Sequence, residues 1–534
     1  MKKFSVLIAI VLIFSVFTGC SHDGYKYTQE LNIIDDNYRN YYEVFLYSFY
    51  DSDGDGIGDI NGLRQKLDYI TDMGFNGIWL MPIMPSTTYH KYDVTDYYGI
   101  DKQYGTIEDF RALISECDER GIKVIIDLVL NHTSAQHPWF KSACDSIVIP
   151  PCGEVDCIHA DKLCSAHNPH CNYYNFTDEY QGGNEYHRVG NSDYFYECVF
   201  WDQMPDLNLA DENLRQDIED IMKYWLDLGV GGFRLDAVKE FYTGGTEKNI
   251  EVLEWINQYC KSVDEDCYIV AEAWDSFTEL TKYYESGIDS VFNFAFAEQT
   301  GKIVKTINYT GIDNSAKSFG EALVYSQDRI NSFNPDGIDA PFFTNHDTAR
   351  GSGYFSYDEQ KLKMAAGMNL TMNGSVFVYY GEEIGMSGSG IDENKRMPML
   401  WSNNDETGIP NPPANASTQD HKFPSVQEQL ADESSIINYF KRGLRIRNEN
   451  PEIARGFITS IDVGDIDICA IKKTYEDSDI YIIYNISENE KSIQLNMDDF
   501  NYDGIRGYLT TTSTDPTLEG DKLTLPPYSI VLLK

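Results

Sequence analysis

The sequence predicts an α/β fold: a (β/α)8 TIM barrel with a B domain inserted after its third strand and a C-terminal antiparallel β-sandwich. Short, almost continuously apolar segments recur between residues 42 and 381, amphipathic stretches separate most of them, and alternating strand candidates follow residue 452. Such apolar runs are typical of parallel strands buried on both faces. An open doubly wound sheet is the alternative, but no glycine-rich phosphate fingerprint follows the first strand candidate.

The strand candidates are rich in β-branched and aromatic residues and cover 42–49, 77–82, 123–130, 232–238, 268–274, 290–296, 340–347 and 375–381. Amphipathic helices are expected between them, for example over 61–74 and 106–121. The interval between the third and fourth candidates is too long for a crossover helix alone. We therefore expect barrel residues 41–131 and 201–451, a B domain over 132–200 and a C-terminal β domain over 452–534.

Residues 1–20 read as a secretion signal, because two lysines precede an apolar run too short for an ordinary membrane-spanning helix. Residues 17–20, FTGC, resemble a bacterial lipobox, in which Cys20 receives lipid; a plain cleaved signal is the alternative. We expect an exported bacterial lipoprotein at the cell surface or outer membrane. The lipid would be its only membrane attachment, with residues 21–40 as a linker.

The formal net charge of −43 argues against nucleic acid and anionic membrane surfaces, which would repel the chain. An uncharged binding partner is more compatible with this negative charge than a polyanion is. The 38 tyrosines include rings that could stack on sugars, although most will fill cores and surfaces. We expect a monomer without an organic cofactor.

Cysteine is concentrated in the predicted B domain, which holds Cys144, Cys152, Cys157, Cys164, Cys171 and Cys198. Export permits disulfides, so we expect a disulfide-stapled B domain, although the spacing does not reveal which cysteines pair. A zinc site is the alternative, but the spacing contains no C-x2-C pair. Cys260 and Cys267 could close a small loop, while Cys117 and Cys469 read as buried thiols.

Polar side chains lie at the C-terminal ends of four of the strand candidates, directly after apolar runs. Because the C-terminal ends of barrel strands ring one opening, we expect these side chains to converge on one pocket. Three carboxylates among them, Asp236, Glu272 and Asp347, come from separate strands and are expected to meet there. The side chains are Asp127, Asn131 and His132, then Arg234 and Asp236, then Glu272, and finally Asn345, His346 and Asp347.

Two carboxylates about 5 to 5.5 Å apart are what retaining cleavage of a glycosidic bond requires. Arg234 shares a strand face with Asp236, so a cation should keep Asp236 ionised and suit it to be the nucleophile. Glu272 is flanked by alanines, an apolar setting that favours the protonated acid. Asp347 and the two histidines could bind ring hydroxyls and stabilise an oxocarbenium-like transition state.

Five motifs resemble those of the α-amylase family, glycoside hydrolase family 13, in the family's order: DLVLNH (127–132), MPDLN (204–208), GFRLDAV (232–238), EAW (272–274) and NHD (345–347). The resemblance covers nearly all of the chain after residue 41. It implies an α-glucan substrate, with Asp236 as nucleophile, Glu272 as general acid/base and Asp347 as transition-state stabiliser. It also implies sugar contacts by Tyr92, Asp127, His132, Arg234, Lys239 and His346.

Residues 51–60, DSDGDGIGDI, begin like an EF-hand loop, but Gly62 occupies the twelfth position, where that loop closes with glutamate. A solvated turn is one reading of the segment. The stretch also resembles the metal loop that oligo-1,6-glucosidases and related amylases carry after the first strand. This resemblance implies a structural Ca²⁺ or Mg²⁺ on Asp51, Asp53, Asp55, Asp59 and the Ile57 carbonyl.

A second calcium site of the kind that many α-amylases have would use Asn131. It is less favoured here, because Glu240 stands where those enzymes carry a histidine.

Two departures narrow the expected substrate. Tyr89 stands where exo-acting oligo-1,6-glucosidases carry an aspartate that grips a terminal glucose, and MPDLN replaces their usual QPDLN. Both favour an α-amylase that cleaves internal α-1,4 bonds of starch or maltodextrin by double displacement. The alternatives are an α-glucosidase or oligo-1,6-glucosidase, a neopullulanase or a transglycosylase of the same family. More remote is a glycan-binding homologue without catalysis.

Overall fold

The computed structural model describes residues 31–159, 161–182, 185–311, 315–417 and 420–534. The predicted signal peptide, Cys20 and the first part of the predicted linker lie outside these residues. The rest of that linker contacts the barrel: Asn32 N donates to the Asn448 carbonyl (2.9 Å), and Asp36 pairs with Arg455 (2.6 Å). Within the described ranges, no helix has both the length and the apolar character needed to cross a membrane.

Eight parallel strands form the barrel, in the order β10-β9-β8-β7-β3-β2-β1-β11. A parallel bridge between Phe342 and Phe377 joins the two ends of this sheet. The predicted (β/α)8 barrel is therefore confirmed, and the open sheet was the wrong alternative. The strands are β1 (Asn40–Val44), β2 (Gly77–Leu80), β3 (Lys123–Leu128), β7 (Gly232–Leu235), β8 (Tyr268–Ala271), β9 (Ser290–Phe292), β10 (Ile338–Ala340) and β11 (Val376–Tyr379).

Every strand candidate overlaps one of these strands, but the predicted C-terminal ends run too far. The candidate at 340–347 overlaps β10 only at Ala340, and Leu46–Ser48 of the first candidate form the 3-10 helix η1. The buried loop residues after each strand are as apolar as the strand itself. The amino-acid composition therefore does not show where the hydrogen bonding between strands ends. The early ends free residues 341–347 to reach the mouth of the barrel.

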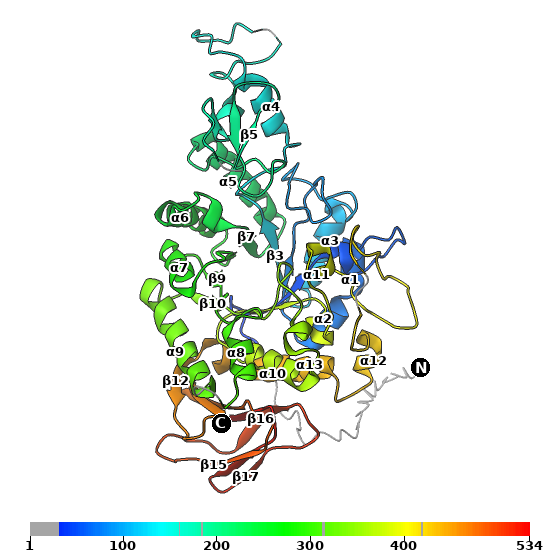
Figure 1. Cartoon of the computed structure of the whole chain (residues 1–534), viewed down its shortest axis with the longest axis vertical. Coiled ribbons are helices and arrows are strands. Elements are labelled where there is room, and N and C mark those ends of the chain that lie inside the picture. The colour runs from blue at the N-terminus through cyan, green and yellow to red at the C-terminus, as the bar shows by residue number, and fades with distance from the viewer. Residues whose placement is uncertain (1–30, 160, 183–184, 312–314, 418–419) are drawn as a thin grey trace, which may run out of the picture.

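Helices surround the barrel (Figure 1). The longer ones bury a row of mainly apolar residues. Helix α3 (Ile107–Asp118) begins with a capping box between Thr106 and Asp109 and buries Phe110 and Leu113. The single helix expected over 61–74 is instead α1 (Ile60–Gln65) and α2 (Leu67–Met73), because the backbone at Lys66 is not helical (φ −106°, ψ 4°).

The other helices of this part of the chain are α5 (Glu212–Asp227), η3 (Val238–Glu240), α6 (Thr246–Val263), α7 (Phe277–Leu280), η4 (Thr281–Ser286), α8 (Lys302–Asn308), α9 (Ser315–Phe333), η5 (Gly351–Phe355), α10 (Glu359–Leu370), η6 (Glu382–Ile384), α11 (Asp392–Lys395), α12 (Val426–Leu430), α13 (Ile436–Glu449) and α14 (Glu452–Arg455).

Between β3 and α5 the chain forms a B region that projects from one end of the molecule (Figure 1). Its helices are α4 (Pro138–Ile147) and η2 (Pro169–Asn172), and β4 (Phe176–Thr177), β5 (Tyr186–Arg188) and β6 (Phe195–Glu197) pair as an antiparallel sheet. An antiparallel bridge between His132 and Asp206 ties the start of the region to its end. The B region is thus anchored beside the barrel mouth.

The C-terminal chain forms two antiparallel sheets at the other end of the molecule (Figure 1), and an apolar cluster that includes Ile483, Leu523 and Val531 fills the space between them. This confirms the predicted sandwich. One sheet has the order β12-β13-β14-β19-β16 and the other β15-β18-β17. Their bounds are β12 (Phe457–Ile461), β13 (Ile468–Tyr475), β14 (Ser478–Asn485), β15 (Lys491–Gln494), β16 (Ile505–Thr510), β17 (Thr517–Glu519), β18 (Lys522–Leu525) and β19 (Ser529–Leu533).

The described cysteines, from Cys117 to Cys469, are all free thiols, so the structure does not contain the disulfides expected in the B region. The Sγ atoms of Cys152 and Cys164 lie 3.8 Å apart, well beyond a disulfide bond length of about 2.05 Å. These sulfurs converge on a histidine ring instead of pairing. Cys260 and Cys267 are both buried.

Candidate active site

A cavity of about 690 Å³ opens at the C-terminal ends of the barrel strands. Asp236 follows β7, Glu272 follows β8, and Asp347 lies on the segment after β10. The B region supplies two aromatic walls, Phe200 and Trp201. Of the residues predicted from the sequence, Tyr92, His132, Asp236, Lys239, Glu272 and Asp347 line this cavity.

Arg234 is the buried centre of the site. Its Nη1 contacts Asp236 Oδ1 (2.5 Å) and Asp127 Oδ1 (2.9 Å), and its Nη2 contacts Glu272 Oε1 (2.8 Å). Alternation along β7 puts Arg234 and Asp236 on one face, and the register of β3 with β7 sets Asp127 opposite Arg234. Three carboxylates from three strands therefore share one guanidinium.

The shared guanidinium also limits how far apart Asp236 and Glu272 can be. Because they bind neighbouring nitrogens of one rigid, planar group, their contacting oxygens lie within roughly 8 Å of each other. The Ala237 amide, next to Asp236, donates to Glu272 Oε2 (3.3 Å) and holds the two segments together. This bound accommodates the separation of about 5 to 5.5 Å that retaining glycosidases use.

Glu272 has the environment of a proton donor. The alanines on either side of it are fully buried, and burial raises the pKa of Glu272 to about 7, although the neighbouring Arg234 acts to lower it. The sequence predicts only apolar neighbours for Glu272, and the structure adds an ion pair with Arg234 that the sequence did not reveal. The net result still favours a protonated carboxyl near neutral pH.

Asp347 has the opposite environment. Arg396 Nη2 donates to Asp347 Oδ1 (2.7 Å), and His346 Nε2 lies 3.0 Å from Asp347 Oδ2. Burial acts to raise the pKa of Asp347, but His346 and Arg396 outweigh it and hold that pKa below its usual range. His346 Nδ1 also contacts Glu43 (2.6 Å); burial opposes its charge, yet the two carboxylates raise its pKa to about 10. His346 is therefore cationic and Asp347 anionic.

Tyr92 links Asp127 to His346. Its hydroxyl donates to Asp127 Oδ2 (3.0 Å) and accepts from His346 Nε2 (2.7 Å). Its ring is stacked on the His346 ring, with centroids 5.6 Å apart. A ring fixed in this way on the cavity wall offers a flat, rigid surface to a sugar.

His132 and Lys239 offer donors at two depths of the cavity. His132 is buried, and burial lowers its pKa, which keeps the ring neutral. Among the described residues, its Nε2 has no hydrogen-bond partner, so this atom is available to a sugar hydroxyl. Lys239 Nζ donates to the Trp274 carbonyl (3.2 Å) and pairs with Asp275 (3.3 Å) at the exposed rim.

Sequence reasoning missed several residues of the site. Glu43 is the only charged residue in the apolar segment 42–49, a signal that could have marked it. Arg396 carries no such signal, because it lies in the polar stretch IDENKR. Phe200 and Trp201 had no pattern that tied them to the barrel strands.

The aspartate loop lies after β1. Carboxylate oxygens of Asp51, Asp53 and Asp59 lie within 4.8 Å of one another, whereas Asp55 is outside this group. Asp51 accepts from the amides of Gly54 (2.6 Å) and Gly56 (2.8 Å), and Asp59 caps α1. In the part of the chain that the structure describes, no lysine, arginine or histidine forms an ion pair with these three carboxylates. An all-oxygen donor set of this kind fits Ca²⁺ or Mg²⁺.

Asn131 is buried where the B region leaves the barrel. Its Nδ2 donates to Asp206 Oδ1 (3.2 Å) and lies 3.3 Å from His132 Nδ1. Glu240 accepts a hydrogen bond from Thr243 (3.1 Å). In this arrangement Asn131 braces the base of the B region.

A closed parallel barrel whose mouth joins paired carboxylates to an arginine and aromatic walls defines the class of protein: a glycoside hydrolase. The model of the α-amylase catalytic domain family matches residues 43–456. The chain belongs to this family, glycoside hydrolase family 13.

Individual proteins of known name are similar to this chain over most of its length. The chain is 36% identical to "Alpha-amylase 3" of Dictyoglomus thermophilum, with 100% of this chain and 99% of that protein covered. It is 29% identical to the glucan 1,6-alpha-glucosidase of Streptococcus pneumoniae, over 85% of this chain and 91% of that one. The solved structure of Eubacterium rectale Amy13B matches with a TM-score of 0.89 and 44% identity, over 95% of this chain and 97% of that chain.

Proposed function

We propose that this protein is a retaining α-amylase that cleaves internal α-1,4-glucosidic bonds of starch, maltodextrin and related α-glucans. The observation that carries the proposal is the pairing of Asp236 and Glu272 on one buried guanidinium, in a cavity with aromatic walls. The raised pKa of Glu272 supports a division of labour between the two carboxyl groups.

In the proposed reaction, Asp236 attacks the anomeric carbon while Glu272 donates its proton to the departing glycosidic oxygen. A covalent glycosyl-enzyme forms on Asp236. Glu272, now a carboxylate, takes a proton from water, which attacks the anomeric carbon and releases Asp236. Arg234 orients both groups, because it hydrogen-bonds to Asp236 and forms an ion pair with Glu272.

Asp347 is proposed to stabilise the oxocarbenium-like transition state. It is held anionic between Arg396 and His346, and a fixed negative charge lowers the energy of positive charge that develops on the sugar ring. Tyr92 would stack on that ring, and the unpartnered His132 Nε2 would bind one of its hydroxyls.

The preference for internal bonds is supported by Tyr89. Its hydroxyl accepts from Arg396 (3.3 Å), which also binds Asp347. No carboxylate stands at this position to grip a terminal glucose. An α-glucosidase or transglycosylase with the same carboxylates is the second candidate, and the similarity to a glucan 1,6-alpha-glucosidase favours keeping it.

The products from starch, pullulan and maltotriose test the specificity. An endo-acting amylase should shorten long dextrins before glucose accumulates, and the Asp236→Asn protein serves as the blank. Release of glucose alone from chain ends, or transfer products longer than the substrate, would favour the second candidate.

We also propose that Asp51, Asp53 and Asp59 hold a structural Ca²⁺ or Mg²⁺, and that Asp55 and the Ile57 carbonyl complete this shell. Bound there, the ion would brace the β1–α1 loop and take no part in the chemistry. Export and lipidation at Cys20 remain proposals that rest on residues 1–20.

A further inference from the structure

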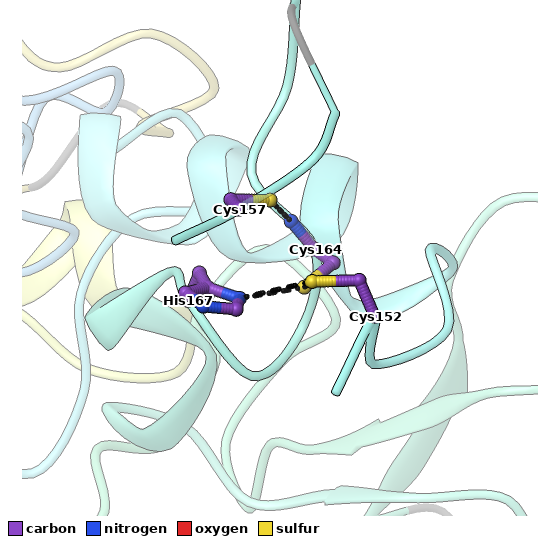
Figure 2. A group of neighbouring side chains, drawn as sticks. All are labelled: Cys152, Cys157, Cys164 and His167. Carbon is purple, nitrogen blue, oxygen red and sulfur yellow. Dashed lines mark hydrogen bonds between the residues drawn. The ribbon is translucent and has the colours of Figure 1, made fainter. Parts of the chain in front are cut away.

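Three cysteines and a histidine gather in the B region, outside the catalytic cavity (Figure 2). They are Cys152, Cys157, Cys164 and His167, and one ligand atom from each lies within 4.8 Å of the others. Cys164 is buried and the other three are half-buried. Four soft donor atoms thus converge on one point.

The distances match the edges of a tetrahedral zinc site. Zinc bonds of about 2.3 Å to sulfur and about 2.0 Å to nitrogen give edges of about 3.8 Å for two sulfurs and about 3.5 Å for sulfur and nitrogen. Cys152 Sγ and Cys164 Sγ are 3.8 Å apart, and Cys152 Sγ lies 3.6 Å from His167 Nδ1. Cys164 Sγ is 3.0 Å from the same nitrogen, a shorter edge.

The surroundings orient these ligands. His167 Nε2 lies 3.3 Å from the Val155 carbonyl, which fixes the proton on Nε2 and leaves the lone pair of Nδ1 facing the sulfurs, free to bind a metal ion. The Cys164 amide donates to Cys157 Sγ (3.4 Å), a bond that stabilises a thiolate. These two hydrogen bonds, to the His167 ring and to the Cys157 sulfur, are of the kind that the side chains around a metal ion commonly make with their neighbours.

The turn that carries Cys164 and His167 is fastened to helix α4. The His167 amide donates to the Cys164 carbonyl (2.9 Å), which closes the turn. Asn168, the next residue, donates to Ser142 O (2.9 Å) and Ser146 Oγ (2.8 Å) of the helix. Two of the four ligands are therefore held in place before any ion binds.

We propose that Cys152, Cys157, Cys164 and His167 bind one Zn²⁺ as a closed, structural Cys3His site. Binding displaces the thiol protons to solvent, so that three thiolates and a neutral imidazole hold the ion. The segment has little apolar core of its own: Val155 and Ile158 are exposed. Zinc would supply the cross-link that disulfides were expected to provide in this region.

Three cysteines cannot all be paired by disulfides among themselves. A disulfide between Cys152 and Cys164 would leave Cys157 and His167 without a partner at this point. A single metal ion uses all four groups, and this favours zinc over the disulfide.

Cobalt substitution tests the site in the intact chain, purified under reductant without metal. Co²⁺ should bind with one equivalent per chain and give thiolate-to-cobalt charge transfer and the intense visible bands of tetrahedral cobalt. Zn²⁺ should displace it. The aspartate loop has no sulfur, so it cannot give the charge-transfer band.

Cys164→Ser and His167→Gln should each weaken cobalt binding at least about tenfold. Cys144→Ser, in the same region but outside the cluster, should bind as the wild type does. X-ray absorption at the zinc edge of the wild-type protein adds a measurement without variants, and three sulfurs and one nitrogen are expected. Absence of a sulfur-ligated metal, or a Cys152–Cys164 disulfide in protein prepared with zinc present, would overturn the proposal.

Discussion

At the scale of single residues, the site depends on how buried charges are shared. Arg234 is fully buried, a state that is costly for an unpaired cation, and Asp127, Asp236 and Glu272 offset this cost. The same contacts fix the positions of the two reacting carboxyl groups. Stability and catalysis therefore depend on the same side chains here.

Asp236→Asn should lower kcat on starch by roughly 10⁴-fold or more, because the amide cannot act as the nucleophile. The amide oxygen can still accept from Arg234, so the melting temperature should change little. Initial rates and thermal melts check this, with Asp118→Asn on the exposed face of α3 as the control. Retained hydrolysis would refute the assignment of Asp236.

The pH profile reports on Glu272. The free enzyme needs this carboxyl protonated, and its pKa is raised to about 7, so kcat/KM should fall as pH rises through about 7. Activity lost with rising pH is the sign expected for an acid with a raised pKa. A basic limb that stays flat to pH values well above this range would contradict the role of proton donor.

At the scale of elements, short strands and long loops build the mouth. Strand β10 ends at Ala340, and the following segment places Asp347 on the cavity wall and His346 in a buried position next to it. The aspartate loop after β1 is likewise a long connection that leaves the sheet. It is held by hydrogen bonds from its own backbone amides to Asp51 and Asp59.

Calcium should raise the melting temperature of chelator-treated protein, because an ion that binds only the folded state stabilises it. Asp53→Asn should remove most of this rise. Cys164→Ser should retain it, which separates the aspartate loop from the cysteine cluster. A wild-type melt that calcium and magnesium leave unchanged would count against the metal loop.

At the scale of the whole molecule, the C-terminal sandwich is joined to the barrel by a buried lysine. Lys473 Nζ donates to the carbonyls of Thr371 (2.8 Å) and Ile453 (2.6 Å). Burial lowers the pKa of Lys473 well below its usual value. The sandwich and the barrel therefore share a buried polar contact, and few other side chains could replace Lys473 in it.

Lys473→Ala should lower the free energy of unfolding by about 2 to 4 kcal/mol, because it leaves a void and two buried carbonyls without donors. Urea denaturation measures this loss. Lys472→Ala, the neighbouring residue whose side chain is part-exposed, should change stability by less than about 1 kcal/mol. Equal effects of the two changes would show that the buried contact is not what matters.

Much of the site could be predicted because it follows strand ends. Asp236, Glu272 and Asp347 each come after an apolar run, and a parallel barrel gathers such positions at one opening. Glu43 and Arg396 escaped prediction because their contacts are long-range: Glu43 and His346 are 303 positions apart in the sequence. Local patterns do not record such pairs.

The sequence by itself determined the order of the barrel strands, the family and the carboxylates at the mouth, since each depends on local periodicity or on a short motif. Only the tertiary structure decided which charges share Arg234, which residues close the cavity, and that the B-region cysteines converge on His167. Those outcomes depend on packing between distant segments, and residue spacing does not specify them.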